Sequence, residues 1–483
     1  MPVTATHPDY DKRIKQWERC RHAVAGEDAI KQAGTVYLPR LSGHTDNEYD
    51  AYKKRAVWYN ATSRTVDGLT GLIFRKPPSI DSPDTLAGLL EDVTTDGLSI
   101  QEFSELVTEE AIVVGRGGIL VDYPHVEVSD EETQAEIEQR GDRPYLAHYA
   151  AEAITNWHTG RIGNRTVLTM VVLKEQFEER EDEFESKVKD QYRVLRLNEA
   201  GQYIQQIWRK FRTEEDREER WRLVGEAAPM MRGAALDYIP FYFFGPRDAS
   251  PSATKPPILD LASMNVAHYR TMADLENGRH WTGLPTPIFT GRFVTEGGEE
   301  VTEVKLGSTE GIHLESDGDA KFLEFTGKGL EALENGAKAK EEYMAVLGAR
   351  ILAQEKRMVE AAETAQIHRS GENSVLASVA NAVSKVLTRA LETLVEWSGA
   401  TAEVTLELNT DFSPTEMSPQ MLQAILGAWQ QGAMAFEDLV EQLKKGELIR
   451  SERTAEDIRQ DHTDEAPAAG GSFSGGVQGG LFG

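Results

Sequence analysis

The sequence predicts an α+β fold, and three patterns support this prediction. Apolar residues recur at three- and four-residue steps in several long stretches, which is the spacing of amphipathic helices. Between 166 and 224 the pattern changes to short runs rich in β-branched and aromatic residues, separated by charged links, which is typical of an antiparallel meander. The clearest helix follows at 376–397, where apolar residues repeat almost as heptads.

The first long helix is predicted to begin at Thr45 and to end before Pro77. Thr45 and Glu48 have the spacing of a capping box, and a proline disfavours helical geometry in the residue before it. Gly68 and Gly71 lie inside this helix, in the stretch GLTGLIFRKPP. Glycine costs about 1 kcal/mol relative to alanine in a helix interior. These two positions therefore need a reason, which is either local packing or close approach by a neighbouring element.

The next elements alternate between helix and strand patterns. The first group comprises a helix at 100–114, the stretch GRGG at 115–118, a strand at 119–124 and an acidic loop at 127–142. The meander comprises strands at 166–173, 192–197, 202–209 and 220–224, with charged links at 178–182 and 213–220, and a buried strand at 239–246 follows it.

The second half of the chain is predicted to be mainly helical. Its elements are a helix at 258–278, a strand-and-turn segment at 284–325, a helix at 329–347, the long helix, a strand at 402–408 and two short helices within 419–448. The last residues are rich in glycine and are expected to be flexible.

The charge of the chain is strongly negative. Its 483 residues include 52 basic and 80 acidic side chains, a net charge of −28, with 40% apolar and 27% charged residues. A protein that clamps nucleic acid by neutralising phosphates needs a basic surplus, and this chain has the reverse. Two explanations of the negative charge remain open. It serves solubility alone, or it belongs to a surface that must not adhere to another polyanion.

The sequence contains no recognisable catalytic or metal-binding motif. GRGG follows a helix and precedes a strand, which is the reverse of a phosphate-binding loop, so its glycines are predicted to end the helix and form a tight turn. GKG at 327–329 lacks the Ser or Thr of an ATP site. The single cysteine, Cys20, excludes an internal disulfide and a cysteine-based zinc site. We therefore expect no enzyme, no cofactor and no metal.

Membrane insertion is not expected either. No apolar run approaches the ~18 residues of a membrane helix, and the N-terminal stretch MPVTATHPDYDKR lacks the apolar core of a signal peptide. The sequence favours assembly in the cytoplasm.

The order of the elements resembles that of the portal protein, or head–tail connector, of tailed bacteriophages, in its siphophage-type form. The resemblance covers about 45–450 and rests on four stretches: TVDGLTGLIFRKPP, PILDLASMNVAHYRTMADLENGRHWTGLPTPIFTG, KFLEFTGKGLEALENGAKAKEEYMAVLGARIL and RSGENSVLASVANAVSKVLTRALE. It implies a ring, normally dodecameric, at one vertex of the capsid, through which DNA is packaged and ejected. The partners it implies are further copies of the chain, capsid or scaffold protein, the terminase large subunit, a head–tail adaptor and, transiently, duplex DNA.

The resemblance also implies a portal-like architecture. It consists of an α/β wing, two stem helices, a small β-rich clip, a long tunnel-to-wing helix and a helical crown. The implied regions are a wing at 1–255, a stem helix at 256–280, a clip at 281–326, a returning stem helix at 327–347, a tunnel loop at 348–368, a long helix and wing strand at 369–414, a crown at 415–450 and a flexible glycine-rich tail at 451–483.

Two sets of candidate residues follow from this resemblance. The candidates to face DNA lie in the tunnel loop and are Arg350, Gln354, Glu355, Lys356 and Arg357, whose cations could instead pair with carboxylates of a solvated loop. The candidates for a subunit interface are the two glycines, which bare a strip of helix backbone, and two polar residues that interrupt the apolar stripe of the helix at 258–278: Gly68, Gly71, Asn265 and His268.

Two alternatives to a portal stay open at this point. One is another structural virion component, such as a minor head protein, without a channel. The other is a nucleotide-dependent enzyme that uses GRGG or GKG, against which the order of elements already argues.

Overall fold

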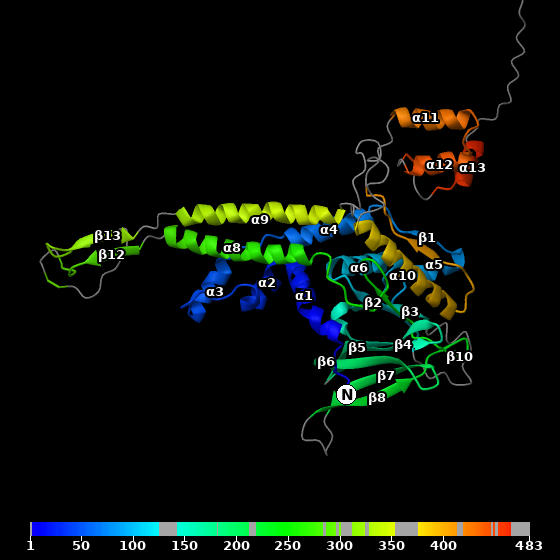
Figure 1. Cartoon of the computed structure of the whole chain (residues 1–483), viewed down its shortest axis with the longest axis horizontal. Helices are drawn as coiled ribbons and strands as arrows, with labels where there is room; N and C mark the ends of the chain where they lie inside the picture. The colour runs from blue at the N-terminus through cyan, green and yellow to red at the C-terminus, as the bar shows by residue number, and fades with distance from the viewer. Residues whose placement is uncertain are drawn as a thin grey trace, which may run out of the picture. The chain divides into compact units, whose positions relative to one another are not determined.

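The computed structural model describes residues 2–124, 143–180, 182–211, 219–283, 286–295, 299–300, 312–323, 328–352, 375–412, 419–445, 448–449 and 453–464. These residues form helices and small antiparallel sheets, so the predicted α+β class is confirmed (Figure 1). The chain divides into two compact units, Met1–Phe412 and Ser413–Gly483. No helix of the described ranges is both long enough and apolar enough to span a membrane.

Two helices precede the position at which the first one was expected. Helix α1 (Pro8–Ala25) begins with proline in its first turn, and the His7 ring nitrogen accepts a hydrogen bond from the Asp9 amide at 3.1 Å. Gly26, with φ +93°, separates α1 from α2 (Glu27–Ala33), and a short 3₁₀ turn, η1 (Gly34–Val36), follows. The prediction that the first long helix begins at Thr45 is therefore wrong, because α1 precedes it. The apolar face of α1 is buried through Trp17, Cys20 and Ala23.

The helix predicted from Thr45 to Pro77 is two helices. The capping box of Thr45 and Glu48 is confirmed, and it opens α3 (Asp46–Arg55). The chain then leaves helical geometry until α4 (Ala61–Ile73) begins. In this break Trp58 is 6% exposed and packs edge-on against Tyr269, with ring centroids 5.8 Å apart. The chain buries this indole against α8 instead of continuing as one helix from α3 to α4.

A three-stranded sheet forms the centre of the first unit. Helix α6 (Ile100–Val113) ends at Gly115, with φ +72°, which confirms the predicted helix end at GRGG. Strand β2 (Gly117–Asp122) then lies between β11 (Phe241–Phe244) and β3 (Tyr145–Ala150). The two glycines of β2 leave room for the rings of Phe241 and Phe244, which lie where a Cβ would be. Helix α10 (Val375–Trp397) packs against this sheet through a continuous apolar face.

The meander is an antiparallel sheet, as predicted, with one more strand. Its order is β4 (Ile154–Ile162), β5 (Arg165–Arg180), β6 (Ser186–Leu197), β7 (Tyr203–Phe211) and β8 (Arg220–Ala227), and β4 was not predicted. The link predicted at 178–182 is wrong in part, because β5 continues to Arg180. The hairpin of β9 (Met230–Met231) and β10 (Ala234–Ala235) leads back to β11. Two predicted segments lie outside the described residues, namely most of the link at 213–220 and all of the acidic loop at 127–142.

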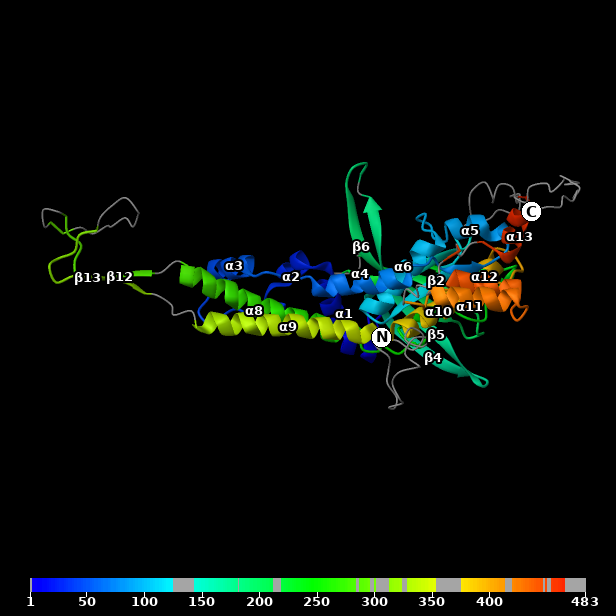
Figure 2. The ribbon, with the colours of Figure 1, turned by 90° about the horizontal axis from the view of Figure 1, so that it is seen from above.

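Two long antiparallel helices follow the sheets. Helix α8 (Leu259–Gly283) lies between α9 (Lys328–Leu352) on one side and α1 and α3 on the other (Figures 1 and 2). Because both sides are covered, α8 shows no single apolar stripe. The segment between these helices contains the antiparallel pair β12 (Thr286–Thr290) and β13 (Asp319–Leu323).

The remaining elements are short. Strand β1 (Ser79–Asp81) pairs with β14 (Thr405–Glu407), and η2 (Asp84–Leu86), α5 (Ala87–Glu91) and η3 (Ala151–Ala153) lie in the first unit. The second unit contains α11 (Pro419–Gln430) and α12 (Phe436–Lys445), as predicted, and also α13 (Ala455–Asp464). The tail predicted from 451 onward therefore begins with a helix, and its glycine-rich part at 465–483 lies outside the described residues.

Candidate assembly surfaces and the buried network of the sheets

The predicted tunnel loop is only partly within the described chain. Helix α9 continues to Leu352, so the first residues of the loop predicted at 348–368 are helical, and Arg350 belongs to the last turn of α9. The other four DNA-facing candidates lie outside the described residues: Gln354, Glu355, Lys356 and Arg357. Their role stays a prediction.

Gly68 and Gly71 lie on the exposed side of α4. A Cβ built on either glycine meets no described atom within 4 Å, so packing inside the described chain does not require glycine at these positions. Arg64, also exposed, precedes the two glycines on the same helical face. Of the two reasons considered for these glycines, local packing is therefore not supported, and the subunit-interface role stays a prediction.

Asn265 of α8 connects two helices inside the chain. Its side chain is fully buried, and its carbonyl oxygen accepts hydrogen bonds from the Thr62 amide at 3.1 Å and the Thr62 hydroxyl at 2.8 Å. Its amide nitrogen donates to the Tyr59 carbonyl at 2.8 Å. Asn60, the residue at the N-cap position of α4, makes no side-chain cap of its own. Asn265 therefore supplies the cap of α4 from a neighbouring helix.

His268 connects α8 to α9. Its side chain is buried, and its Nε2 lies 3.1 Å from Glu341 Oε1. Burial lowers the pKa of His268, and the Glu341 carboxylate opposes this shift. The interface role predicted for Asn265 and His268 stays a prediction, while the structure gives both side chains partners within one chain.

The outer side of the helix pair carries apolar surface. On α9, Ala332, Ala339, Tyr343 and Val346 are exposed at helical spacing, and Tyr343 is 56% exposed. On the β12–β13 pair, Phe322 is 65% exposed. Exposed apolar side chains gathered along one helix are typical of surfaces that other proteins cover.

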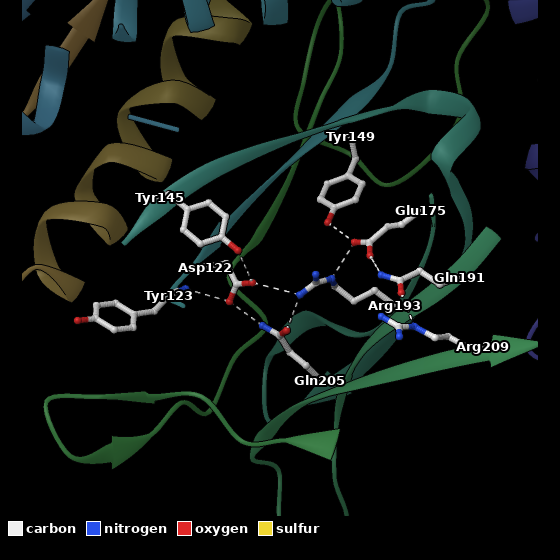
Figure 3. Close-up of polar contacts among 9 residues, drawn as sticks. All are labelled: Asp122, Tyr123, Tyr145, Tyr149, Glu175, Gln191, Arg193, Gln205 and Arg209. Atoms are coloured by element: carbon white, nitrogen blue, oxygen red, sulfur yellow. Dashed lines mark hydrogen bonds and ion pairs between the residues drawn. The ribbon is translucent and has the colours of Figure 1, made fainter. Parts of the chain in front are cut away.

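A buried ionic network joins the central sheet to the meander (Figure 3). Arg193 of β6 lies between two carboxylates, with Nε 2.7 Å from Glu175 of β5 and Nη1 3.3 Å from Asp122 of β2. Burial raises the pKa of Asp122, and the Arg193 guanidinium opposes this shift. One cation thus neutralises part of the charge of two anions on different sheets.

Neutral side chains complete this network. Tyr149 donates to Glu175 at 2.6 Å, Tyr145 donates to Asp122 at 3.2 Å, and Gln205 donates to Asp122 at 2.7 Å. The outermost members, Gln191 and Arg209, are joined at 3.0 Å (Figure 3). Because both carboxylates already accept several protein hydrogen bonds, the geometry favours fixing one sheet against the other over binding a cofactor. The sequence signal for this network was Asp122, a charged residue inside the apolar run ILVDYP.

A second ionic cluster holds α1 in place. Arg21 of α1 lies 2.6 Å from Glu110 of α6 and 2.5 Å from Glu152 of η3. Glu110 also accepts a hydrogen bond from the Ala151 amide at 3.1 Å. No group of three or more His, Cys, Asp or Glu residues that could hold a metal ion occurs in the part of the chain that the structure describes.

The fold and these contacts define an α+β protein in which a long helix pair and two buried ionic clusters hold the elements together. Residues 257–398, which include α8, α9 and α10, match the family described as Domain of unknown function (DUF4055). No curated protein matched the sequence.

Three chains of known structure share a broad likeness with this one. A chain of the virion of the native gene transfer agent (GTA) particle is 14% identical, with a TM-score of 0.36, over 86% of this chain and 97% of that chain. A chain from the neck of the empty GTA particle, computed with C6 symmetry, is 14% identical, with a TM-score of 0.36, over 83% and 94%. A chain from the neck of the native GTA particle, computed with C12 symmetry, is 12% identical, with a TM-score of 0.34, over 86% and 98%.

Proposed function

We propose that this chain is the subunit of a phage portal ring, which forms the DNA channel at one capsid vertex. The observation that carries the proposal is the antiparallel pair α8 and α9, joined through the segment that contains β12 and β13. This order of helix, small antiparallel sheet and returning helix is what the resemblance implies for stem, clip and stem. The long helix α10 and the helices of the second unit then take the places of the tunnel-to-wing helix and the crown.

The exposed surfaces give such a subunit a reason to associate with copies of itself. The bare strip at Gly68 and Gly71 and the apolar outer side of α9 have no partner among the described residues. Glycines kept in a helix without an internal packing reason favour close approach by another chain, because the backbone itself becomes the contact surface.

The negative charge suits a channel through which DNA moves. Cationic contacts with phosphates hold DNA by releasing counterions, whereas an acidic wall repels it and leaves it mobile. A net charge of −28 supports this part of the proposal. The other partners of the proposed ring are the capsid or scaffold protein, the terminase large subunit and the head–tail adaptor, and its location is the virion.

Negative-stain imaging of the purified chain, combined with a DNA-binding measurement, tests the proposal. We expect closed rings with a central channel that bind duplex DNA weakly at about 0.15 M salt, because few phosphates are neutralised. Particles without a channel would favour a minor head protein instead. Tight binding of duplex DNA by the rings at that salt concentration would contradict the proposed role of the acidic wall.

A further inference from the structure

Residues 2–7, which we call the strap, lie against the meander. The His7 amide donates to the Thr155 carbonyl at 2.9 Å, and the side-chain amide of Asn156 donates to the Ala5 carbonyl at 3.0 Å. Both partners belong to β4, which is an edge strand of this sheet. Figure 1 shows the marked N-terminal end of the chain beside these strands. The second half of the strap is therefore fixed to the sheet by hydrogen bonds.

The first half of the strap covers a small apolar cluster through Val3, whose side chain is half-buried. The cluster is separate from the main core and takes its side chains from four neighbouring strands of the meander: Met170, Val172, Tyr192, Val194, Trp208 and Trp221. Tyr192 and Trp221 meet edge to face, with ring centroids 4.7 Å apart. Among the described residues, Val3 is the only member of the cluster from outside the meander. Lifting the strap would therefore uncover an apolar, aromatic face.

His7 joins the strap to α1. It occupies the N-cap position of this helix, where its Nδ1 accepts a hydrogen bond from the Asp9 amide at 3.1 Å. An imidazole nitrogen accepts a hydrogen bond only when it carries no proton, so this cap requires neutral His7. Protonation would take the acceptor away from the Asp9 amide and would place a cation at the positive end of the helix dipole.

The Trp157 ring of β4 contacts both His7 and a buried cation. The imidazole and the indole are stacked, with ring centroids 3.9 Å apart. The Arg116 guanidinium lies over the same indole, with Cζ 4.0 Å from the ring centroid. Arg116 is 1% exposed and donates to the Pro251 carbonyl, while its Nε and Nη2 have no partner among the described residues. A positive charge on His7 would thus lie near a buried guanidinium that is bonded to a neutral acceptor, which makes the second charge unfavourable.

The surroundings of His7 act on its charge in both directions. Burial is the main cause and lowers the pKa of His7. The carboxylates of Asp9 and Asp11, both on α1, raise this pKa, whereas the Arg116 guanidinium and His158 of β4 lower it. The net shift is downward, so the closed strap favours the neutral imidazole. Opening the strap therefore becomes easier as the pH falls below the ordinary pKa of histidine, because the open form takes up a proton.

We propose that His7 is a pH-sensitive latch, which in its neutral form holds the strap over the apolar cluster and in its protonated form releases it. The other anchors described above are backbone groups, the Asn156 amide and Val3, none of which titrates near neutral pH. The pH dependence of the strap therefore comes from His7. This inference goes beyond the proposed ring and does not depend on it, because every contact of the latch lies within one chain.

Amide hydrogen exchange of the full chain at about pH 7.5 and about pH 5.5 tests the latch. The amides of His7 and Asp9 report its opening, because both lose their acceptors when the strap lifts. After correction for the intrinsic effect of pH on exchange, opening should become up to about tenfold more frequent at the lower pH, because the released imidazole titrates near its ordinary pKa of 6.5. Equal corrected exchange at the two pH values would contradict the proposal.

Three variants separate titration of His7 from its structural role. In His7→Asn the side chain can still cap α1 but does not titrate, so exchange should be slow at both pH values. His7→Ala removes the cap and the ring, so exchange should be fast at both. The matched control His158→Asn removes the other histidine nearby and should keep the pH dependence of the wild type. If His7→Asn keeps that dependence, or if His158→Asn abolishes it, His7 is not the latch.

Oxidation of Met170 by hydrogen peroxide shows whether the apolar cluster is uncovered. Met170 belongs to the cluster, whereas Met230 is 62% exposed and serves as the internal reference in the same sample. The rate for Met170 relative to Met230 should rise from about pH 7.5 to about pH 5.5 in the wild type and stay constant in His7→Asn, because the thioether itself does not titrate. A constant ratio in the wild type would show that the strap does not release the cluster and would overturn the proposal.

Discussion

Replacing Gly71 should change chain stability and ring assembly in opposite directions. A Cβ at position 71 meets no described atom within 4 Å, so a larger side chain causes no clash inside the described chain. Alanine or leucine in place of a helical glycine is worth about 0.5–1 kcal/mol of helix stability. Gly71→Ala and Gly71→Leu should therefore raise the free energy of unfolding of the dissociated chain by about this amount. Leucine at this position would also fill the bare strip of α4 and hinder a neighbouring subunit.

Two measurements on the same variants test this reasoning. Urea unfolding followed by tryptophan fluorescence gives the stability, and analytical ultracentrifugation gives the fraction of chain in rings. We expect Gly71→Leu to lower the ring fraction more than Gly71→Ala does. Gly88, an exposed glycine of α5 that also has open space around its Cβ position, provides the matched control Gly88→Leu. Normal ring assembly by Gly71→Leu, or loss of stability in Gly71→Ala, would refute the interface role of the strip.

Three further predictions concern the buried polar groups. Arg193→Met should destabilise the chain by about 3 kcal/mol, because it leaves the carboxylates of Asp122 and Glu175 without their shared cation. Since burial raises the pKa of Asp122, the loss in urea-unfolding free energy should become smaller as the pH falls, because protonation of Asp122 removes an unpaired buried charge. Asn265→Ala should lower the free energy of unfolding by about 2–4 kcal/mol, because it removes the cap of α4 and leaves buried groups of Thr62 and Tyr59 unpaired. Amide hydrogen exchange should accelerate first at the start of α4, and equal exchange there in the variant and the wild type would count against the cap. Burial lowers the pKa of His148 to about 4, so the unfolded chain binds a proton that the folded chain does not, and stability should fall as the pH falls from about 6.5 to 4. His148→Gln should make the melting temperature depend less on pH in this range. An unchanged dependence would show that other groups determine it.

The local signals in the sequence predicted local structure well. The capping box of Thr45 and Glu48, the helix end at Gly115 and the apolar repeat of α10 each depend on residues within a few positions of one another. The meander was recognisable because each strand carries its own pattern of β-branched and aromatic residues. These elements required no knowledge of what they pack against.

Features set by distant contacts could not be predicted in the same way. The break between α3 and α4 depends on Trp58, which is buried against Tyr269 about two hundred positions later in the chain. The cap that Asn265 supplies to Thr62 is equally remote in sequence, so the polar interruption of the apolar stripe indicated a candidate for a subunit interface and gave no sign of the cap. The length of β5 was underestimated because its outer part, 174–180, carries mostly charged and polar side chains, and its last three residues are exposed on both faces.

The buried network of the sheets shows the same limit at the level of a site. Asp122 was visible as a charged residue in an apolar strand, but its partners Arg193 and Gln205 come from strands of another sheet. Pairing these residues requires the register of β6 and β7, which charge patterns alone do not fix.

Native mass spectrometry of the purified full chain can determine whether copies of this chain form the closed ring that we propose. We predict one dominant species with a uniform number of subunits, which persists on dilution because heterologous contacts close on themselves. A monomer, or a series of open oligomers whose length grows with concentration, would contradict the claim.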